Sequence, residues 1–278
     1  MKALYSALFV SLIAIFGSPR CLASPFQQQS AAVTQPAPPT PEEVHPLIKT
    51  AAAKQAATSP TIVIGFLGGH VKKNNAVHTE VQVAMHLRHS HPVGVHAEVF
   101  QNTEGSAALR EILRLLDVNH DGVLSDAEKL HARIILYGHS WGASETVTLA
   151  HHLQSEGIPV LLTVLVDRVS KIGEGDESIP ANVAQAVNFY QLDGLLHGWR
   201  TIRAADPEHT QILGNYQFDY KNNPVSCDQY PWYARLFMGP HIEIENDPRV
   251  WNQVEALISS RLPPEQSPAT VALIGQPR

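Results

Sequence analysis

The segment Gly138-His139-Ser140-Trp141-Gly142 decides the fold that we expect for this chain. It follows the apolar, β-prone run at 133–137 and precedes 143–150, whose sequence is typical of a helix. A strand, a tight turn and a helix in this order are the setting of a nucleophile elbow. The small glycines let the backbone bend sharply, so the Ser140 hydroxyl projects above the end of its strand. The pattern therefore predicts a nucleophilic serine at that position.

Apolar strands alternate with helical patterns on both sides of this turn. We expect strands at 61–66, 93–100, 133–137, 159–166, 184–191 and 211–218. We expect helices at 77–89, 106–116, 143–154 and 248–260. Continuous apolar strands that alternate with helices indicate a parallel sheet covered on both faces. The predicted fold class is therefore α/β, with a mostly parallel sheet of about six strands and helices on both faces.

Composition divides the chain into four parts. At 278 residues with 44% hydrophobic content, the chain can bury one sizeable core and need not contain two domains. Residues 1–23 combine a basic start, an apolar run and a small-residue cleavage site, which is typical of a secretory signal peptide. Residues 24–60 are rich in Pro, Ala and Gln and predict a linker. One globular domain is expected at 61–262, followed by a disordered tail at 263–278.

Charge and targeting restrict the partners and the compartment. A signal peptide implies an extracytoplasmic protein, either periplasmic or secreted. Its removal takes away Lys2 and Arg20 and no acidic residue, so the net charge changes from −6 to −8. That negative charge argues against nucleic acid as a partner. We expect no membrane-spanning segment after cleavage, because no later run is long and apolar enough.

A serine nucleophile needs a histidine to take its proton and an acid to orient that histidine. Asp167 directly follows the apolar run at 161–166, so we expect it at the carboxyl end of the next strand. Asp193, after the following strand, is the rival acid. The expected base is His241, in a predicted loop before the last helix, with His197 in reserve. Along the chain, the three expected residues therefore follow the order serine, acid, histidine.

The tetrahedral intermediate of acyl transfer needs two hydrogen-bond donors for its oxyanion. One expected donor is the backbone N–H of Trp141, directly after the nucleophile. The second is expected from the glycine-rich loop at 65–70, where the small residues let the backbone approach a substrate. Within that loop we favour Leu67, with Gly68 second.

These motifs together resemble the α/β-hydrolase superfamily, particularly its serine esterases, lipases and thioesterases. The resemblance spans about 61–261 and rests on the Gly68-Gly69 loop, the 138–142 turn, Asp167 and His241. The usual N-terminal antiparallel hairpin is not apparent, which implies a minimal form of the α/β-hydrolase fold. The resemblance implies a small-molecule or lipid ester as substrate.

A second motif, at 117–128, matches the twelve-residue loop of an EF-hand. Gly122 supplies its sharp turn, and the expected calcium ligands are Asp117, Asn119, Asp121, Val123 (through its carbonyl), Ser125 and Glu128. The loop departs from the EF-hand family, because no second loop pairs with it and only 129–132 separates it from the next strand. We therefore expect structural Ca²⁺ that fixes this crossover, and not a calcium sensor.

The sequence supports two functional hypotheses. The first is an exported serine hydrolase that cleaves a carboxylic ester or thioester, uses Ser140, His241 and Asp167, and has a structural calcium site. The alternative is a non-catalytic, calcium-binding extracytoplasmic protein on a hydrolase scaffold. The serine, acid and histidine in order favour the first hypothesis.

Overall fold

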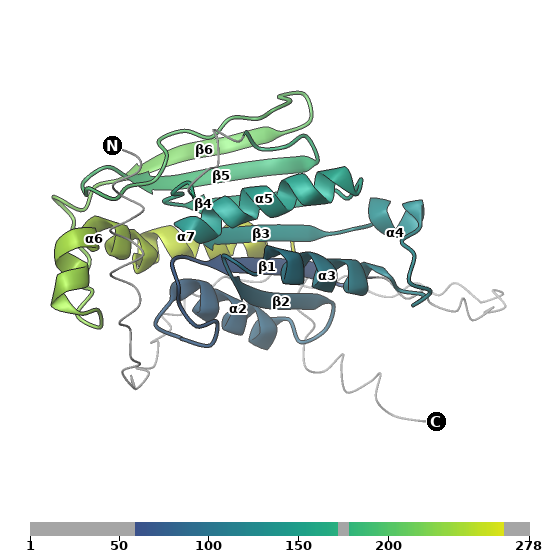
Figure 1. Ribbon diagram of the computed structural model, residues 1–278, viewed down its shortest axis with the longest axis horizontal. Coiled ribbons are helices and arrows are strands. Elements are labelled where there is room, and N and C mark those ends of the chain that lie inside the picture. The colour runs from purple at the N-terminus through teal and green to yellow at the C-terminus, as the bar shows by residue number, and fades with distance from the viewer. Residues whose placement is uncertain (1–58, 172–177, 264–278) are drawn as a thin grey trace, which may run out of the picture.

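The computed structural model describes residues 59–171 and 178–263, and they form a six-stranded sheet with helices on either side (Figure 1). The strand order is β2-β1-β3-β4-β5-β6, and all five pairings are parallel. The strands are β1 (Thr61–Leu67), β2 (Val95–Gln101), β3 (Ile134–His139), β4 (Val160–Val166), β5 (Val183–Gln191) and β6 (Gln211–Phe218). The predicted α/β class is confirmed, and the architecture agrees with a minimal α/β-hydrolase fold.

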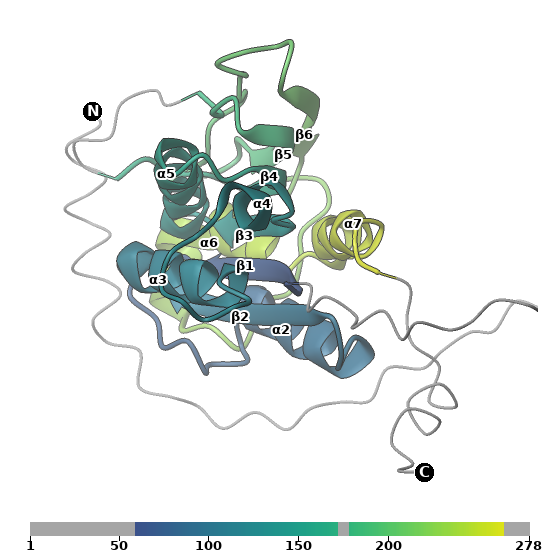
Figure 2. The ribbon, with the colours of Figure 1, turned by 90° about the vertical axis from the view of Figure 1, so that its right-hand side faces the viewer.

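Helices cover both faces of the sheet, and the described residues form six of them. They are α2 (Thr79–Ser90), α3 (Gly105–Leu116), α4 (Asp126–Leu130), α5 (Trp141–Ser155), α6 (Trp232–Glu245) and α7 (Pro248–Ser259). In Figure 2, α3 and α5 lie on one side of the sheet, and α2 and α7 lie on the other. Helix α6 lies beside one end of the strands (Figure 1).

The alternation of side chains along β1 explains why both faces need a layer of helices. Ile62, Ile64 and Phe66 pack against α3 and α5, whereas Val63 packs against α2 and α7. Successive residues of a strand point to opposite faces, so an apolar strand has two faces to bury. Burial of each such side chain stabilises the fold by about 1.5–3 kcal/mol.

Helix α6 is the main departure from the predicted elements. The sequence analysis places His241 in a loop, and this prediction is wrong, because His241 lies inside α6. The chain does kink near the Gly239-Pro240 pair, where Met238 has a φ of −128° and a ψ of 16°. Pro240 then lies in the first turn of the helical segment after the kink, where proline is tolerated.

Several predictions about the termini fall outside the described residues. The signal peptide at 1–23, the linker up to residue 58 and the tail from residue 264 belong to this part of the chain. Export and the disordered tail therefore stay predictions. Among the described residues, no helix has the length and apolar character needed to cross a bilayer.

Two glycines fix the junction between β3 and α5. A Cβ atom at Gly142 would lie 2.6 Å from the carbonyl carbon of Phe66, at the end of β1. A Cβ atom at Gly138 would lie 2.6 Å from the carbonyl carbon of Gly142. Backbone therefore packs on backbone here, and neither neighbour can move aside as a flexible side chain could.

We predict that Gly142→Ala lowers the free energy of unfolding by about 3 kcal/mol, because the added methyl group overpacks a backbone contact. Urea denaturation of the purified protein would measure this loss. Gly239→Ala is the matched control, since its Cβ would meet only the Glu243 side chain, at 3.8 Å. Equal stability of the two variants would contradict the close packing at the turn.

Candidate active site

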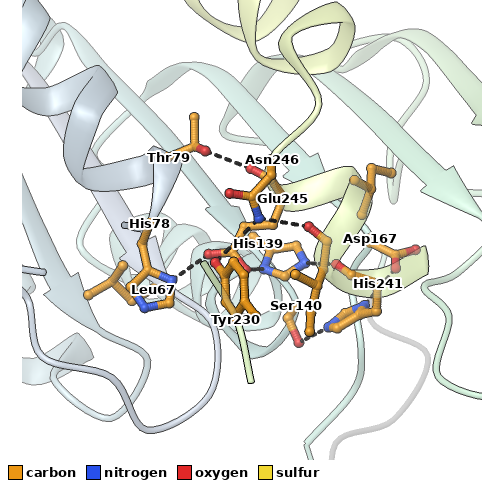
Figure 3. Close-up of polar contacts among 12 residues, drawn as sticks. Leu67, His78, Thr79, His139, Ser140, Asp167, Tyr230, His241, Glu245 and Asn246 are labelled. Carbon is orange, nitrogen blue, oxygen red and sulfur yellow. Dashed lines mark hydrogen bonds and ion pairs between the residues drawn. The ribbon is translucent and has the colours of Figure 1, made fainter. Parts of the chain in front are cut away.

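The structure brings three predicted residues together at the carboxyl ends of the strands. Ser140 follows β3, Asp167 follows β4, and His241 comes from α6. The His241 Nε2 atom lies 2.8 Å from the Ser140 Oγ, and its Nδ1 atom lies 2.6 Å from the Asp167 Oδ2 (Figure 3). A hydroxyl, an imidazole and a carboxylate are therefore connected by two hydrogen bonds.

The two rival residues have other partners. The Asp193 Oδ2 accepts hydrogen bonds from the backbone N–H groups of Tyr220 and Lys221. His197 is exposed, and its Nδ1 donates to the carbonyl oxygen of Gly198. The geometry therefore favours Asp167 over Asp193 and His241 over His197.

Ser140 occupies the strained turn that the sequence pattern predicts. Its φ is 56° and its ψ is −123°, a conformation that residues with a side chain rarely adopt and that costs about 1–3 kcal/mol. The turn is held on both sides: the Ser140 N–H donates to the Val166 carbonyl over 2.9 Å, and its carbonyl accepts the Ser144 N–H over 3.3 Å. The strain is thus offset by the bonds and packing around the turn.

Asp167 is fully buried and accepts four hydrogen bonds. Its Oδ1 accepts the backbone N–H groups of Gly198 (2.7 Å) and Gln191 (3.2 Å), and its Oδ2 accepts the Gln191 Nε2 (2.8 Å) and His241. Burial alone would raise the pKa of Asp167, but the His241 ring and the Gln191 amide outweigh it and hold the pKa below 3.8. Asp167 is therefore an ionised acceptor, so His241 donates through Nδ1 and its Nε2 can take the serine proton.

Gln191 is a functional residue that the sequence analysis missed. It is the last residue of β5 and fully buried, and its Nε2 also donates to the Leu196 carbonyl over 2.9 Å. The sequence does contain one signal for this role. Gln191 is a polar residue at the end of β5, the strand that follows β4 and Asp167 along the chain.

The hydroxyl of Ser140 is covered and not open to solvent. Ser140 is only 1% exposed and lines a cavity of about 50 Å³. The lining residues are Gly68, Gly69, Val71, His78, His139, Ser140, Tyr230, Met238, His241, Ile242 and Glu245. Ligand pockets commonly measure about 300–1,000 Å³, so this cavity suits one or two water molecules.

The expected oxyanion donors lie on either side of the serine. Trp141 is the first residue of α5, where backbone N–H groups point out of the helix end. Leu67 ends β1 and buries its side chain in a small apolar cluster. Gly68 lies directly against the serine, since a Cβ there would be 3.0 Å from the Ser140 Cβ. Leu67 and Gly68 both remain predicted candidates for the second N–H donor to the oxyanion.

A second group of buried polar residues lies beside the triad, and the sequence analysis did not predict it. The His78 Nδ1 lies 2.5 Å from the Glu245 Oε1 (Figure 3). Glu80 is fully buried, and His139 donates through Nε2 to the His241 carbonyl over 3.2 Å. His78 and Glu245 are 167 residues apart, so no local pattern could have connected them.

Burial and neighbouring charge shift the pKa values of this group, in opposite directions at His78 and in the same direction at Glu80 and at His139. Burial would lower the pKa of His78, but the Glu245 carboxylate raises it to about 9. Burial raises the pKa of Glu80, and the nearby charge of Glu245 raises it further. Burial and the neighbouring His241 lower the pKa of His139 to about 4. At neutral pH, His139 is therefore an uncharged imidazole.

The loop at 117–128 has backbone features of the predicted calcium motif. Gly122 has a φ of 81°, and the Asp117 carboxylate accepts the N–H groups of Asp121 and Gly122. The Glu128 side chain accepts the Ser125 N–H over 2.9 Å, which caps the short α4. The exiting helix is only five residues long, as the spacing predicts.

Oxygen donors of this kind suit calcium. The carboxylates bond to amides of the loop, however, and they are not among the close groups of metal-ligating side chains found in the described ranges 59–171 and 178–263. Calcium binding therefore stays a prediction.

Comparison with known proteins gives only remote similarities. No known family profile and no curated protein matches the chain. Among solved structures, a cutinase-like protein from Cryptococcus sp. is 14% identical with a TM-score of 0.36, covering 76% of this chain and 100% of that one. Human thioesterase 2 is 10% identical with a TM-score of 0.38, covering 72% and 95%. An esterase from Pseudomonas putida is 10% identical with a TM-score of 0.34, covering 63% and 72%. Similarity at this level leaves the function to be inferred from the site itself.

We predict that Asp167→Asn lowers the free energy of unfolding by about 3 kcal/mol at pH 7, because the buried N–H groups of Gln191, Gly198 and His241 lose their charged acceptor. The folded-state pKa of Asp167 lies below the unfolded value of 3.8. Its contribution is therefore present above pH 3.8 and is lost as the pH falls through the folded value. Urea denaturation at a series of pH values should show the gap between wild type and variant closing below pH 3.8.

Asp193→Asn is the control for this series, since Asp193 is exposed and makes none of the hydrogen bonds of Asp167. A gap between wild type and Asp167→Asn that stays constant down to pH 2 would contradict an ionised Asp167.

Proposed function

We propose that this protein is a serine hydrolase that cleaves a carboxylic ester or thioester. The observation that carries the proposal is the pair of hydrogen bonds that connects Ser140, His241 and Asp167. The Ser140 Oγ attacks the carbonyl carbon while the His241 Nε2 takes the hydroxyl proton. The bond to the alcohol or thiol then breaks, and that leaving group receives the proton from His241. Water, activated by the same imidazole, hydrolyses the acyl-enzyme and restores the serine.

Asp167 orients the imidazole and stabilises the cation that forms on it. Its four hydrogen bonds keep the carboxylate ionised and in place. The developing oxyanion would lie at the N-terminus of α5, where the helix dipole favours negative charge. The Trp141 N–H and a second N–H from Leu67 or Gly68 are the proposed donors.

The walls of the cavity support an apolar acyl group. Val71, Met238 and Ile242 contribute apolar side chains to the lining. Helix α6 contributes one wall and has exposed apolar residues near its start, including Trp232 and Leu236. We therefore propose a small-molecule or lipid ester as substrate, which enters when α6 moves away from the serine. The proposal includes export of the protein.

The loop at 117–128 is the second part of the proposal. Calcium bound by Asp117, Asn119, Asp121, Val123, Ser125 and Glu128 would hold the crossover between α3 and β3. The low exposure of Ser140, 1%, is the observation that favours the alternative, a non-catalytic calcium-binding protein. The two functions can be distinguished by the reactivity of Ser140, which is a nucleophile in the hydrolase and unreactive in the non-catalytic protein.

We predict that a serine-directed fluorophosphonate labels the wild type and that Ser140→Ala abolishes labelling. Turnover of p-nitrophenyl esters should fall by about 10⁴-fold or more in that variant. Ser144→Ala is the matched control: it lies one turn further along α5, and its hydroxyl bonds to the Val169 carbonyl over 2.9 Å. Wild-type protein that is folded but reacts with neither reagent would leave only the alternative.

We predict that removal of calcium by EGTA lowers the Tm by about 5–10 °C, because ligand bound only to the folded state stabilises it. Differential scanning calorimetry with added calcium should restore the Tm of wild type but not that of Glu128→Gln. Asp126→Asn is the control, since Asp126 is exposed in the same loop and is not a predicted ligand. An unchanged Tm after chelation would contradict a structural calcium site.

A further inference from the structure

The Glu80 side chain lacks the partners that a buried carboxylate normally has. Glu80 is 0% exposed, and neither of its side-chain oxygens makes a hydrogen bond. The amides of Gly68 and Glu80 lie close enough to affect its charge, but neither is aligned for a hydrogen bond. Buried polar groups are rarely left in this state, because the lost hydration costs about 1–3 kcal/mol or more. The carboxylate is therefore missing a partner.

His139 has a second unsatisfied atom in the same place. Its Nε2 lies 3.2 Å from the His241 carbonyl oxygen, which can only accept, so Nε2 carries the proton. The Nδ1 atom consequently presents a lone pair, and it makes no hydrogen bond. That lone pair lies 3.8 Å from the Glu245 Oε2, another acceptor. Two acceptors face each other with no donor between them.

His78 completes the group. One ligand atom each from His78, Glu80 and Glu245 lies within 4.8 Å of the other two, and all three residues are buried. The His139 Nδ1 lies outside this compact group, 3.8 Å from the second oxygen of Glu245, and would have to move toward the group to become the fourth ligand. The four residues then offer two imidazole nitrogens and two carboxylates. A metal ion would displace the proton between His78 and Glu245 and any proton on Glu80, and the two carboxylates would then carry a charge of −2, which one divalent cation balances.

We propose that His78, Glu80, His139 and Glu245 bind a divalent transition-metal ion, with zinc as the first candidate. Zinc takes four nitrogen and oxygen ligands in a tetrahedron, at about 2.0–2.2 Å. Ligand atoms are then about 3.3 Å apart, so the His78 Nδ1 and the Glu245 Oε1 would separate by about 0.8 Å. Metal-binding histidines commonly donate their other N–H to a backbone carbonyl, and His139 already does so.

The metal would position the triad from the wall of the cavity that Ser140 also lines. His139 directly precedes Ser140, and its N–H holds the backbone of His241. Glu245 lies at the end of α6, one turn after His241. A metal bound by both residues would fix α6 against the end of β3 (Figure 3). Metal binding does not depend on the proposed hydrolase activity and can be tested without a substrate.

The test uses the full chain, stripped with a strong chelator and then supplied with saturating calcium, so that oxygen-rich sites are filled. Titration with Zn²⁺ should show one bound equivalent by elemental analysis and a raised Tm. Glu80→Gln, which keeps the side-chain shape, should weaken zinc binding by more than about 100-fold. The matched control is Glu98→Gln in the partly exposed group His96, Glu98 and Glu111, where Arg114 already pairs with Glu111. This control should bind zinc as wild type does.

Absence of zinc binding by the wild type, or equal binding by Glu80→Gln and Glu98→Gln, would overturn the proposal. If Glu80→Gln does not fold, X-ray absorption at the zinc edge of the wild type decides. A first shell with two imidazoles and oxygen ligands supports the site, and a shell without imidazole overturns it.

Discussion

The strained backbone of Ser140 is the constraint on which the rest of the site depends. With a φ of 56°, the residue turns its hydroxyl away from β3 and toward the imidazole, while its N–H still bonds to the end of β4. The turn fits only because Gly142 lets α5 begin in contact with the carbonyl of Phe66. Strand pairing, helix packing and the position of the nucleophile are thus set by one short stretch of backbone.

The histidine side of the site is held by a different set of contacts. His241 comes from α6, and the end of this helix is bonded to the start of α2. The Thr79 hydroxyl donates to the Glu245 carbonyl oxygen, and His78 pairs with the Glu245 carboxylate (Figure 3). The same helix contributes Met238, His241, Ile242 and Glu245 to the wall of the cavity beside the serine. A movement of α6 that admits substrate would therefore also move the imidazole.

Local patterns in the sequence predicted the sheet and the triad for physical reasons. Buried parallel strands are continuous apolar runs, and the chain order of serine, acid and histidine predicted Ser140, Asp167 and His241, which the structure brings into hydrogen-bond contact. Helix α6 was missed because Gly239 and Pro240 indicate a break, whereas the proline only starts a new helical segment. The pairing of His78 with Glu245 could not be predicted, because it depends on how α2 and α6 meet in space. The burial of Ser140 could not be predicted for the same reason, because it depends on where α6 lies relative to β3.

The most direct test of the account is the crystal structure of the protein after reaction with a phosphonate ester. We expect phosphorus bonded to the Ser140 Oγ, with the His241 ring still within hydrogen-bond distance of that atom. One phosphoryl oxygen should lie within hydrogen-bond distance of the Trp141 N–H and of the backbone at Leu67 or Gly68. A phosphoryl oxygen directed away from Trp141, or an adduct on another residue beside an unmodified Ser140, would contradict the account.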